Sequence, residues 1–122
     1  MEERPNNIVA ASILALVGAL LSLAVLISEL DLFADDFAMR TGFHVLAVIL
    51  FLAVAGSLNM NGLWSWRFLI FMEVLCVMAP IAALLFEYTY ILYAAVLVLL
   101  AAGAILFTAS AGSRRWIEAD RV

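Results

Sequence analysis

Charged residues are scarce in this chain of 122 residues: Asp, Glu, Lys and Arg together make up 13% of it, and lysine is absent. A soluble domain of this size has about a quarter of its residues charged. The hydrophobic fraction is 68%, which is more apolar surface than a soluble fold of this length can bury. The composition therefore excludes an ordinary soluble domain and predicts an integral membrane protein.

The residue types that bind metals or catalyse reactions are also few. The chain has one cysteine and one histidine, which excludes an intramolecular disulfide and a metal site made of several cysteines. No apolar run contains a serine–histidine pair, an HExxH motif or paired aspartates, so we expect no enzyme. No large basic face is present, and we expect no nucleic-acid partner, no nucleotide and no cofactor.

Four apolar runs are long enough to cross a bilayer as helices, and short polar segments separate them. About 20 residues of helix span the hydrocarbon core. The first run follows an acidic lead and is too long for the core of a signal peptide, so we expect it to be retained. We predict one domain, residues 1–122, built as an all-α bundle of four transmembrane helices with short loops. The predicted spans cover residues 8–28, 41–58, 67–87 and 90–111.

Small residues recur at helical spacing in two of the runs, which lets a neighbouring helix approach closely. In the first run they lie four residues apart, and in the fourth run seven residues apart. We predict that both stripes are packing seams: Ala11, Ala15 and Ala19 in the first run, and Ala95, Ala102 and Ala109 in the fourth.

The connection after the first run is the one long loop. Its apolar residues Leu30, Phe33 and Phe37 repeat at helical spacing, with aspartates between them. Two interpretations stay open: an amphipathic segment, residues 30–39, that lies on the membrane surface, or a solvated acidic loop. We expect residues 113–122 to form a polar tail.

The arginines are divided unevenly between the two sides of the predicted spans. With four spans, both termini and the loop between the second and third spans lie on one side, and the other side holds only Arg40. Segments rich in arginine stay in the cytoplasm. We therefore predict a multi-pass protein of the cell membrane with both termini in the cytoplasm. The tryptophans fall on the arginine side and the tyrosines on the other, as belts at two interfaces would.

The third run contains a glutamate and a proline, which are unusual inside a membrane span. Glu73 lies six residues after Arg67, about 9 Å deeper along a helix axis. Helical spacing places Glu73, Cys76 and Pro80 on one face, and Pro80 leaves the carbonyl of Cys76 without its helical donor. These three residues are our candidate intramembrane polar or ion site.

Competing hypotheses for Glu73 lead to different functions. In the first, the glutamate ties helices together or contacts a partner protein, and Cys76 packs as a small hydrophobe. The chain is then a non-catalytic accessory or structural subunit that packs against other membrane proteins or against itself, within the lipid bilayer. In the alternative, Glu73 carries a proton or small cation in a homo-oligomeric transporter or channel.

A second group of candidate residues is predicted at the other side of the membrane. Arg40 and His44 lie one helical turn apart near the start of the second run, and Glu87 ends the third. We interpret them as polar contacts at the outer interface. A histidine in a span is also a candidate haem ligand, but this chain has no second histidine to complete a bis-histidine site.

The chain is similar to the small multidrug resistance transporters in its length and its number of predicted spans. That family forms four-helix homodimers with an essential glutamate in the first helix. Here the first run has no carboxylate, and the glutamate lies in the third run at position 73. The similarity covers length and topology alone, and we assign no family from it.

Overall fold

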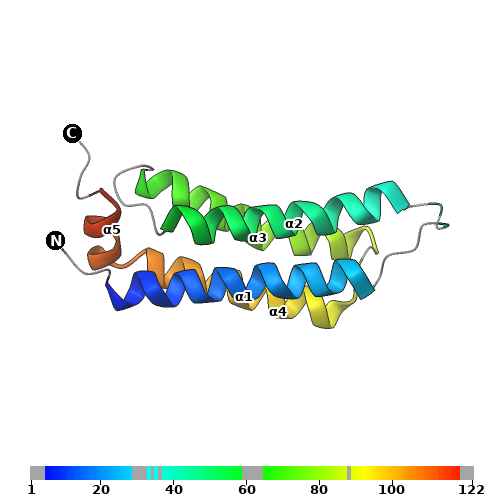
Figure 1. Ribbon diagram of the computed structural model, residues 1–122, viewed down its shortest axis with the longest axis horizontal. Coiled ribbons are helices and arrows are strands. Elements are labelled where there is room, and N and C mark those ends of the chain that lie inside the picture. The colour runs from blue at the N-terminus through cyan, green and yellow to red at the C-terminus, as the bar shows by residue number, and fades with distance from the viewer. Residues whose placement is uncertain are drawn as a thin grey trace.

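The computed structural model describes residues 5–28, 33, 35, 37–58, 65–87 and 89–118, and every regular element in these residues is a helix. Four long helices form an antiparallel bundle: α1 (Asn6–Ser28), α2 (Phe37–Leu58), α3 (Trp66–Leu85) and α4 (Ile91–Thr108). A short helix, α5 (Ala111–Glu118), lies across one end of the bundle (Figure 1). We call this end the α5 end and the other the opposite end.

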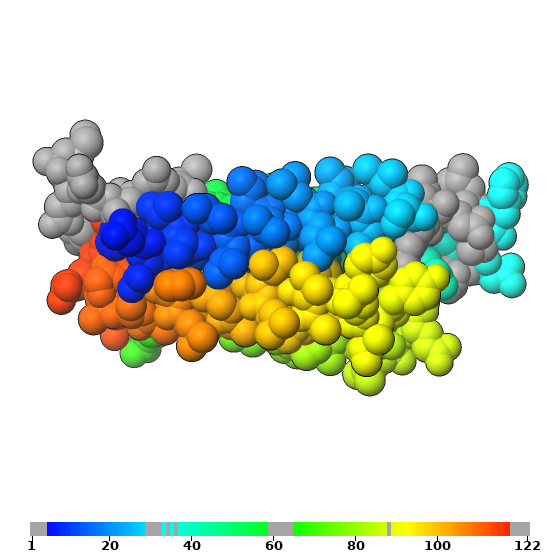
Figure 2. Space-filling view, turned by 90° about the horizontal axis from the view of Figure 1, so that it is seen from below, coloured from blue at the N-terminus to red at the C-terminus, as the bar shows by residue number. Residues whose placement is uncertain are grey.

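The four long helices form a ring in chain order. α1 packs on α2, α2 on α3, α3 on α4, and α4 returns to α1. Figure 2 shows α1 and α4 side by side along the molecule. Because α1 and α3 begin at the α5 end while α2 and α4 finish there, the first and last described helices meet at the same end (Figure 1).

Each of the four long helices is long and apolar enough to cross a membrane. The helices contain 23, 22, 20 and 18 residues, which corresponds to about 27–35 Å. The prediction of an all-helical chain with four such helices is confirmed. Large apolar side chains cover the outward surfaces, among them Ile13, Leu20, Leu46, Ile49, Phe71, Met78, Leu99 and Leu106.

Local signals explain where α3 begins and ends. The side chain of Ser65 accepts a hydrogen bond of 3.1 Å from the backbone N–H of Phe68, so Ser65 caps the helix. The helix continues through Pro80. After Leu85, Glu87 adopts a φ of 62°, the left-handed conformation with which many helices end. The cap at Ser65 sets the residue at which α3 begins.

Two predicted segments, the span 41–58 and the surface segment 30–39, meet at the start of α2. The helix begins at Phe37, four residues before the predicted span, and includes Arg40. α4 is therefore the shortest of the four long helices. Of the predicted surface segment 30–39, residues 37–39 belong to α2 and residues 33 and 35 lie in turns; the others fall outside the described residues.

The first part of the predicted polar tail, residues 113–118, belongs to the helix α5, and Trp116 and Ile117 of this part are buried. Ser110 caps this helix: its hydroxyl accepts a hydrogen bond of 3.2 Å from the N–H of Ser113, and its carbonyl accepts one of 3.0 Å from the N–H of Arg114. Residues 119–122 fall outside the described residues.

One of the two predicted seams is confirmed. Ala11, Ala15 and Ala19 of α1 are buried, and a Cβ added at Gly18 would lie 2.4 Å from ring atoms of Phe51 in α2. The stripe predicted for the fourth helix is not the one buried within the bundle, since Ala95 and Ala109 are exposed. The buried stripe of α4 begins one residue earlier, at Ala94, and contains Ala94, Leu97, Ala101, Ala104 and Thr108. Ala94, Ala101 and Thr108 also lie seven residues apart, so the spacing alone does not choose between the two stripes.

Candidate functional site: a buried carboxyl near the α5 end

Glu73 lies on the inner face of α3, seven residues after the helix begins at Trp66. This places it about 10 Å along the helix axis from the α5 end. Its side chain is 1% exposed. An ionised carboxylate inside a span costs about 2.5–3.5 kcal/mol on membrane-insertion scales. The groups that surround the carboxyl therefore determine how much of this cost is offset.

Thr108, the last residue of α4, supplies one hydrogen bond to this carboxyl. The hydroxyl Oγ1 of Thr108 donates to Oε1 of Glu73 at 2.7 Å, and both side chains are fully enclosed. The other carboxyl oxygen, Oε2, is buried without a hydrogen-bond partner among the described residues. The contact joins α3 to α4 inside the bundle.

Trp66 extends this polar contact to the surface. Its indole Nε1–H donates to the backbone carbonyl of Thr108 at 2.7 Å. That carbonyl belongs to the last turn of α4, where it has no partner within its own helix. The guanidinium carbon of Arg114 lies 4.9 Å from the centroid of the Trp66 ring, a cation–π contact. Glu73, Thr108, Trp66 and Arg114 therefore link α3, α4 and α5 in one chain of contacts, which we call the polar link.

The corner between α4 and α5 is held by its own serines. The hydroxyl of Ser113 donates to the carbonyl of Phe107 at 2.8 Å, and the hydroxyl of Ser110 donates to that of Ser113 at 2.9 Å. Ser113 is fully buried. These bonds turn the chain sharply after α4 and set α5 across the bundle end.

Trp116 and Ile117 of α5 close the core at this end. They are 6% and 1% exposed, and they belong to the same hydrophobic cluster as Ile8 of α1, Leu58 of α2 and Leu69 of α3. Glu73 is thus separated from the α5 end by a layer of packed side chains. Sequence analysis placed Trp116 in a polar tail and missed this layer.

The three residues of the predicted intramembrane site share one buried face, as expected. Glu73, Cys76 and Pro80 are all buried on α3, and Cys76 is 2% exposed. Cys76 is a free cysteine that packs in the hydrophobic cluster. The unpaired carbonyl at Cys76 stays a prediction. Sequence analysis missed Thr108, the residue that contacts the carboxyl. The pattern that could have indicated it is its position seven residues after Ala101, on the buried stripe of α4.

The second predicted group lies at the opposite end of the bundle. His44 is buried at 6% exposure on the inner face of α2, and Arg40 is half-buried one turn earlier. Glu87 is exposed in the turn after α3. The three residues share this end of the molecule but differ in burial, and a direct contact between Glu87 and the α2 pair stays a prediction. Among the described residues, no three His, Cys, Asp or Glu side chains are grouped so that they would hold a metal ion.

The described surface is hollowed along α2. A groove of about 480 Å³ lies between α1 and α2, lined by Val9, Ser12, Ile13, Leu16, Leu52, Ala55 and Gly56. A second groove, of about 250 Å³, lies between α2 and α3, lined by Phe43, Leu46, Leu50, Leu75, Met78, Ala79 and Ala82. Glu73 lines neither groove.

The arrangement around Glu73 joins α3 to α4 through one carboxyl, one hydroxyl and one indole N–H, and the stacking of Arg114 on Trp66 adds α5. Such groups also exchange protons where a path to water exists, and packed apolar side chains enclose them on the α5 side. Comparison of the chain with protein-family models, with curated proteins and with solved structures found no match.

Proposed function

We propose that this chain is a non-catalytic accessory or structural subunit of the cell membrane, which packs against other membrane proteins or further copies of itself. The proposal rests on the contact that Glu73 makes inside the bundle. This carboxyl, the one acidic side chain within the four long helices, accepts a hydrogen bond from Thr108 and lines neither α2 groove. A carboxyl held in this way stabilises helix packing inside the subunit.

The outward face of α2 is the surface we assign to the partner helix. Both grooves run along α2. A Cβ added at Gly42 or Gly56 would meet no atom within 4 Å, whereas the glycine at position 18 is packed against Phe51. Small residues on an outward helix face allow a second helix to approach closely in a bilayer. This face is therefore suited to another transmembrane helix.

The orientation follows from the charges at the two ends. Arg67, Arg114 and Arg115 are exposed at the α5 end, and Arg40 is at the opposite end. Because arginine-rich segments stay in the cytoplasm, we assign the α5 end and both termini to the cytoplasmic side.

Native mass spectrometry of the protein, expressed near its natural level and extracted in mild detergent, tests the proposal. We expect the chain to appear in stoichiometric complexes, either with larger membrane proteins or with further copies. A chain that is monomeric at all detergent concentrations would contradict the proposal.

Gly56→Leu tests the assigned face. The added side chain enters open space and leucine favours helix more than glycine does, so we expect the bundle to keep its stability while complexes are lost. Ala95→Leu is the control, because Ala95 is exposed on α4, away from this face. Loss of complexes in Ala95→Leu and not in Gly56→Leu would show that the interface lies on α4 instead of α2.

One observation favours the second candidate, a small homo-oligomeric transporter or channel coupled to protons or cations. Oε2 of Glu73 is buried without a hydrogen-bond partner among the described residues, and such an oxygen is available to a proton or cation. In liposomes, the transporter hypothesis expects Glu73→Gln to abolish proton flux while assembly is unchanged. The subunit hypothesis expects no flux in the wild type and weaker assembly or stability in Glu73→Gln. A variant that matches the wild type in flux, assembly and stability would contradict both roles for Glu73.

A further inference from the structure

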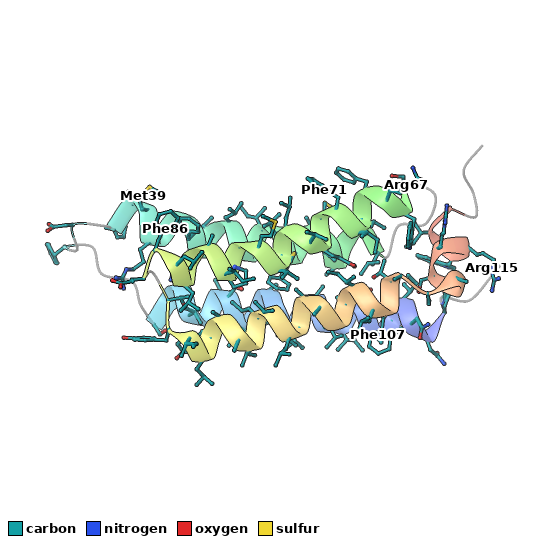
Figure 3. All side chains as sticks on the ribbon, turned by 180° about the vertical axis from the view of Figure 1, so that it is seen from behind. Met39, Arg67, Phe71, Phe86, Phe107 and Arg115 are labelled. Atoms are coloured by element: carbon teal, nitrogen blue, oxygen red, sulfur yellow. The ribbon has the colours of Figure 1, made fainter. Side chains whose placement is uncertain are left out.

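The α5 end presents both cations and apolar side chains to the outside of the bundle. Arg67 of α3 and Arg114 and Arg115 of α5 are exposed, and Figure 3 shows Arg67 and Arg115 at this end on different elements. Exposed aromatic rings lie in the same parts of the helices: Phe68 and Phe71 follow Arg67 on α3, and Phe107 is near the end of α4.

Arg67 and Phe71 illustrate the arrangement. They lie four residues apart on α3 and therefore share one face of the helix. Figure 3 shows both on the outer side of α3, with Arg67 at the end of the helix and Phe71 nearer its middle. A guanidinium group stands at the end of the helix, and an aromatic ring lies four residues, about 6 Å, further toward the middle of the bundle.

The cations on α5 are held in place by packing. Arg114 stacks against Trp66, which is fixed by its hydrogen bond to Thr108. Arg115 precedes Trp116 and Ile117, which anchor α5 in the core. A short helix that buries one side in the bundle end and exposes arginines on the other is positioned at the membrane surface.

We propose that the α5 end is a binding surface for anionic phospholipid. Guanidinium groups form paired hydrogen bonds with phosphate oxygens, and Arg67, Arg114 and Arg115 supply them at the headgroup level. Phe68, Phe71 and Phe107 contact the acyl chains. The apolar rings near this end distinguish a phospholipid from free phosphate, since free phosphate has no group to place against them.

Tryptophan quenching by brominated lipids measures this preference, because Trp66 and Trp116 both lie at the α5 end. The purified full chain is reconstituted in bilayers of phosphatidylcholine or phosphatidylglycerol with brominated acyl chains. An arginine near an anionic surface contributes about a fivefold preference, so we expect the wild type to favour phosphatidylglycerol by about fivefold or more. The triple variant Arg67→Gln, Arg114→Gln, Arg115→Gln is expected to lose this preference.

The single variants Arg67→Gln and Arg115→Gln keep the contact between Arg114 and Trp66, and each is expected to lose part of the preference even if the triple variant fails to fold. Arg40→Gln removes one charge at the opposite end and is expected to bind like the wild type. An unchanged preference in both single variants, or an equal loss in Arg40→Gln, would overturn the proposal. Loss of the wild-type preference on adding about 10 mM inorganic phosphate, at constant ionic strength, would assign the arginines to free phosphate instead.

Discussion

The two ends of the bundle are built differently, although the same four helices make both. At the α5 end the core is closed by large buried side chains: Ile8, Leu58, Leu69, Trp116 and Ile117. At the opposite end large apolar side chains stay at the surface: Leu85, Phe86, Tyr90 and Ile91. Figure 3 shows Phe86 and Met39 at that end, away from Arg67 and Arg115.

The difference comes from the residues that follow each helix. After α4, Ser110 and Ser113 turn the chain back so that α5 lies across the bundle. After α3, the chain turns at Glu87 in a left-handed conformation and enters α4 within a few residues, so this turn adds no helix. The comparison teaches that the extra helix α5 closes the core at the end where Glu73 is buried, while the donor to Glu73 comes from α4. Glu73, Thr108 and Trp66 meet near the end that has the extra element.

Removal of Trp116 is expected to have the largest effect. Trp116→Ala removes a side chain that is 6% exposed, and large-to-small changes at buried aromatic positions cost about 3–5 kcal/mol. Phe86→Ala at the opposite end removes a ring that is 63% exposed, and we expect a loss below about 1 kcal/mol. Unfolding of both variants in mixed detergent micelles measures the difference. Equal losses would show that the two ends contribute alike to stability.

The polar link is expected to contribute less to the free energy of unfolding than Trp116 does. Thr108→Val removes the hydroxyl that donates to Glu73 at 2.7 Å and leaves the carboxyl without that donor, at a cost of about 1–2 kcal/mol. Glu73→Leu removes the carboxyl and fills the same space, and we expect a change below about 1 kcal/mol. The double variant is expected to resemble Glu73→Leu alone.

A double-mutant cycle on these variants gives the coupling energy. Hydrogen bonds between transmembrane helices average about 0.6 kcal/mol and reach about 1.7 kcal/mol, and we expect a value in the upper half of this range because both groups are fully buried. A coupling near zero would mean that the contact between Glu73 and Thr108 does not stabilise the bundle.

The smallest change in the free energy of unfolding is expected at Glu87. This change is a stabilisation, whereas the other variants lose stability. A non-glycine residue with positive φ costs about 1 kcal/mol, and Glu87 adopts a φ of 62°. Glu87→Gly relieves this strain but increases the freedom of the unfolded chain, so we expect a net stabilisation of about 0.5 kcal/mol. The same unfolding assay measures it, with Glu87→Ala, which keeps the strain, as control. A gain of equal size in Glu87→Ala would assign the effect to the lost charge.

Hydropathy predicted the four long helices because it is a local property. Each run of about 20 apolar residues is long enough by itself to cross a bilayer, whatever its neighbours are. The face of α3 that carries Glu73, Cys76 and Pro80 was predicted for a similar reason, since residues three and four apart share a face in any helix. The seam of Ala11, Ala15 and Ala19 on α1 followed from the same geometry.

The tertiary structure decided which residues meet. A seven-residue spacing fits Ala95, Ala102 and Ala109 as well as Ala94, Ala101 and Thr108, and only the rotation of α4 against α1 and α3 buries the second set. That rotation also brings Thr108 to Glu73 across 35 positions of sequence.

The sequence by itself determined an all-helical chain with four helices able to cross a membrane, and the side chains on each helix face. Packing between helices determined the partner of Glu73, the closed α5 end and the place of Trp116. The reason is that helix formation depends on neighbours in sequence, whereas the rotation and depth of each helix depend on side chains that the chain brings together from distant segments.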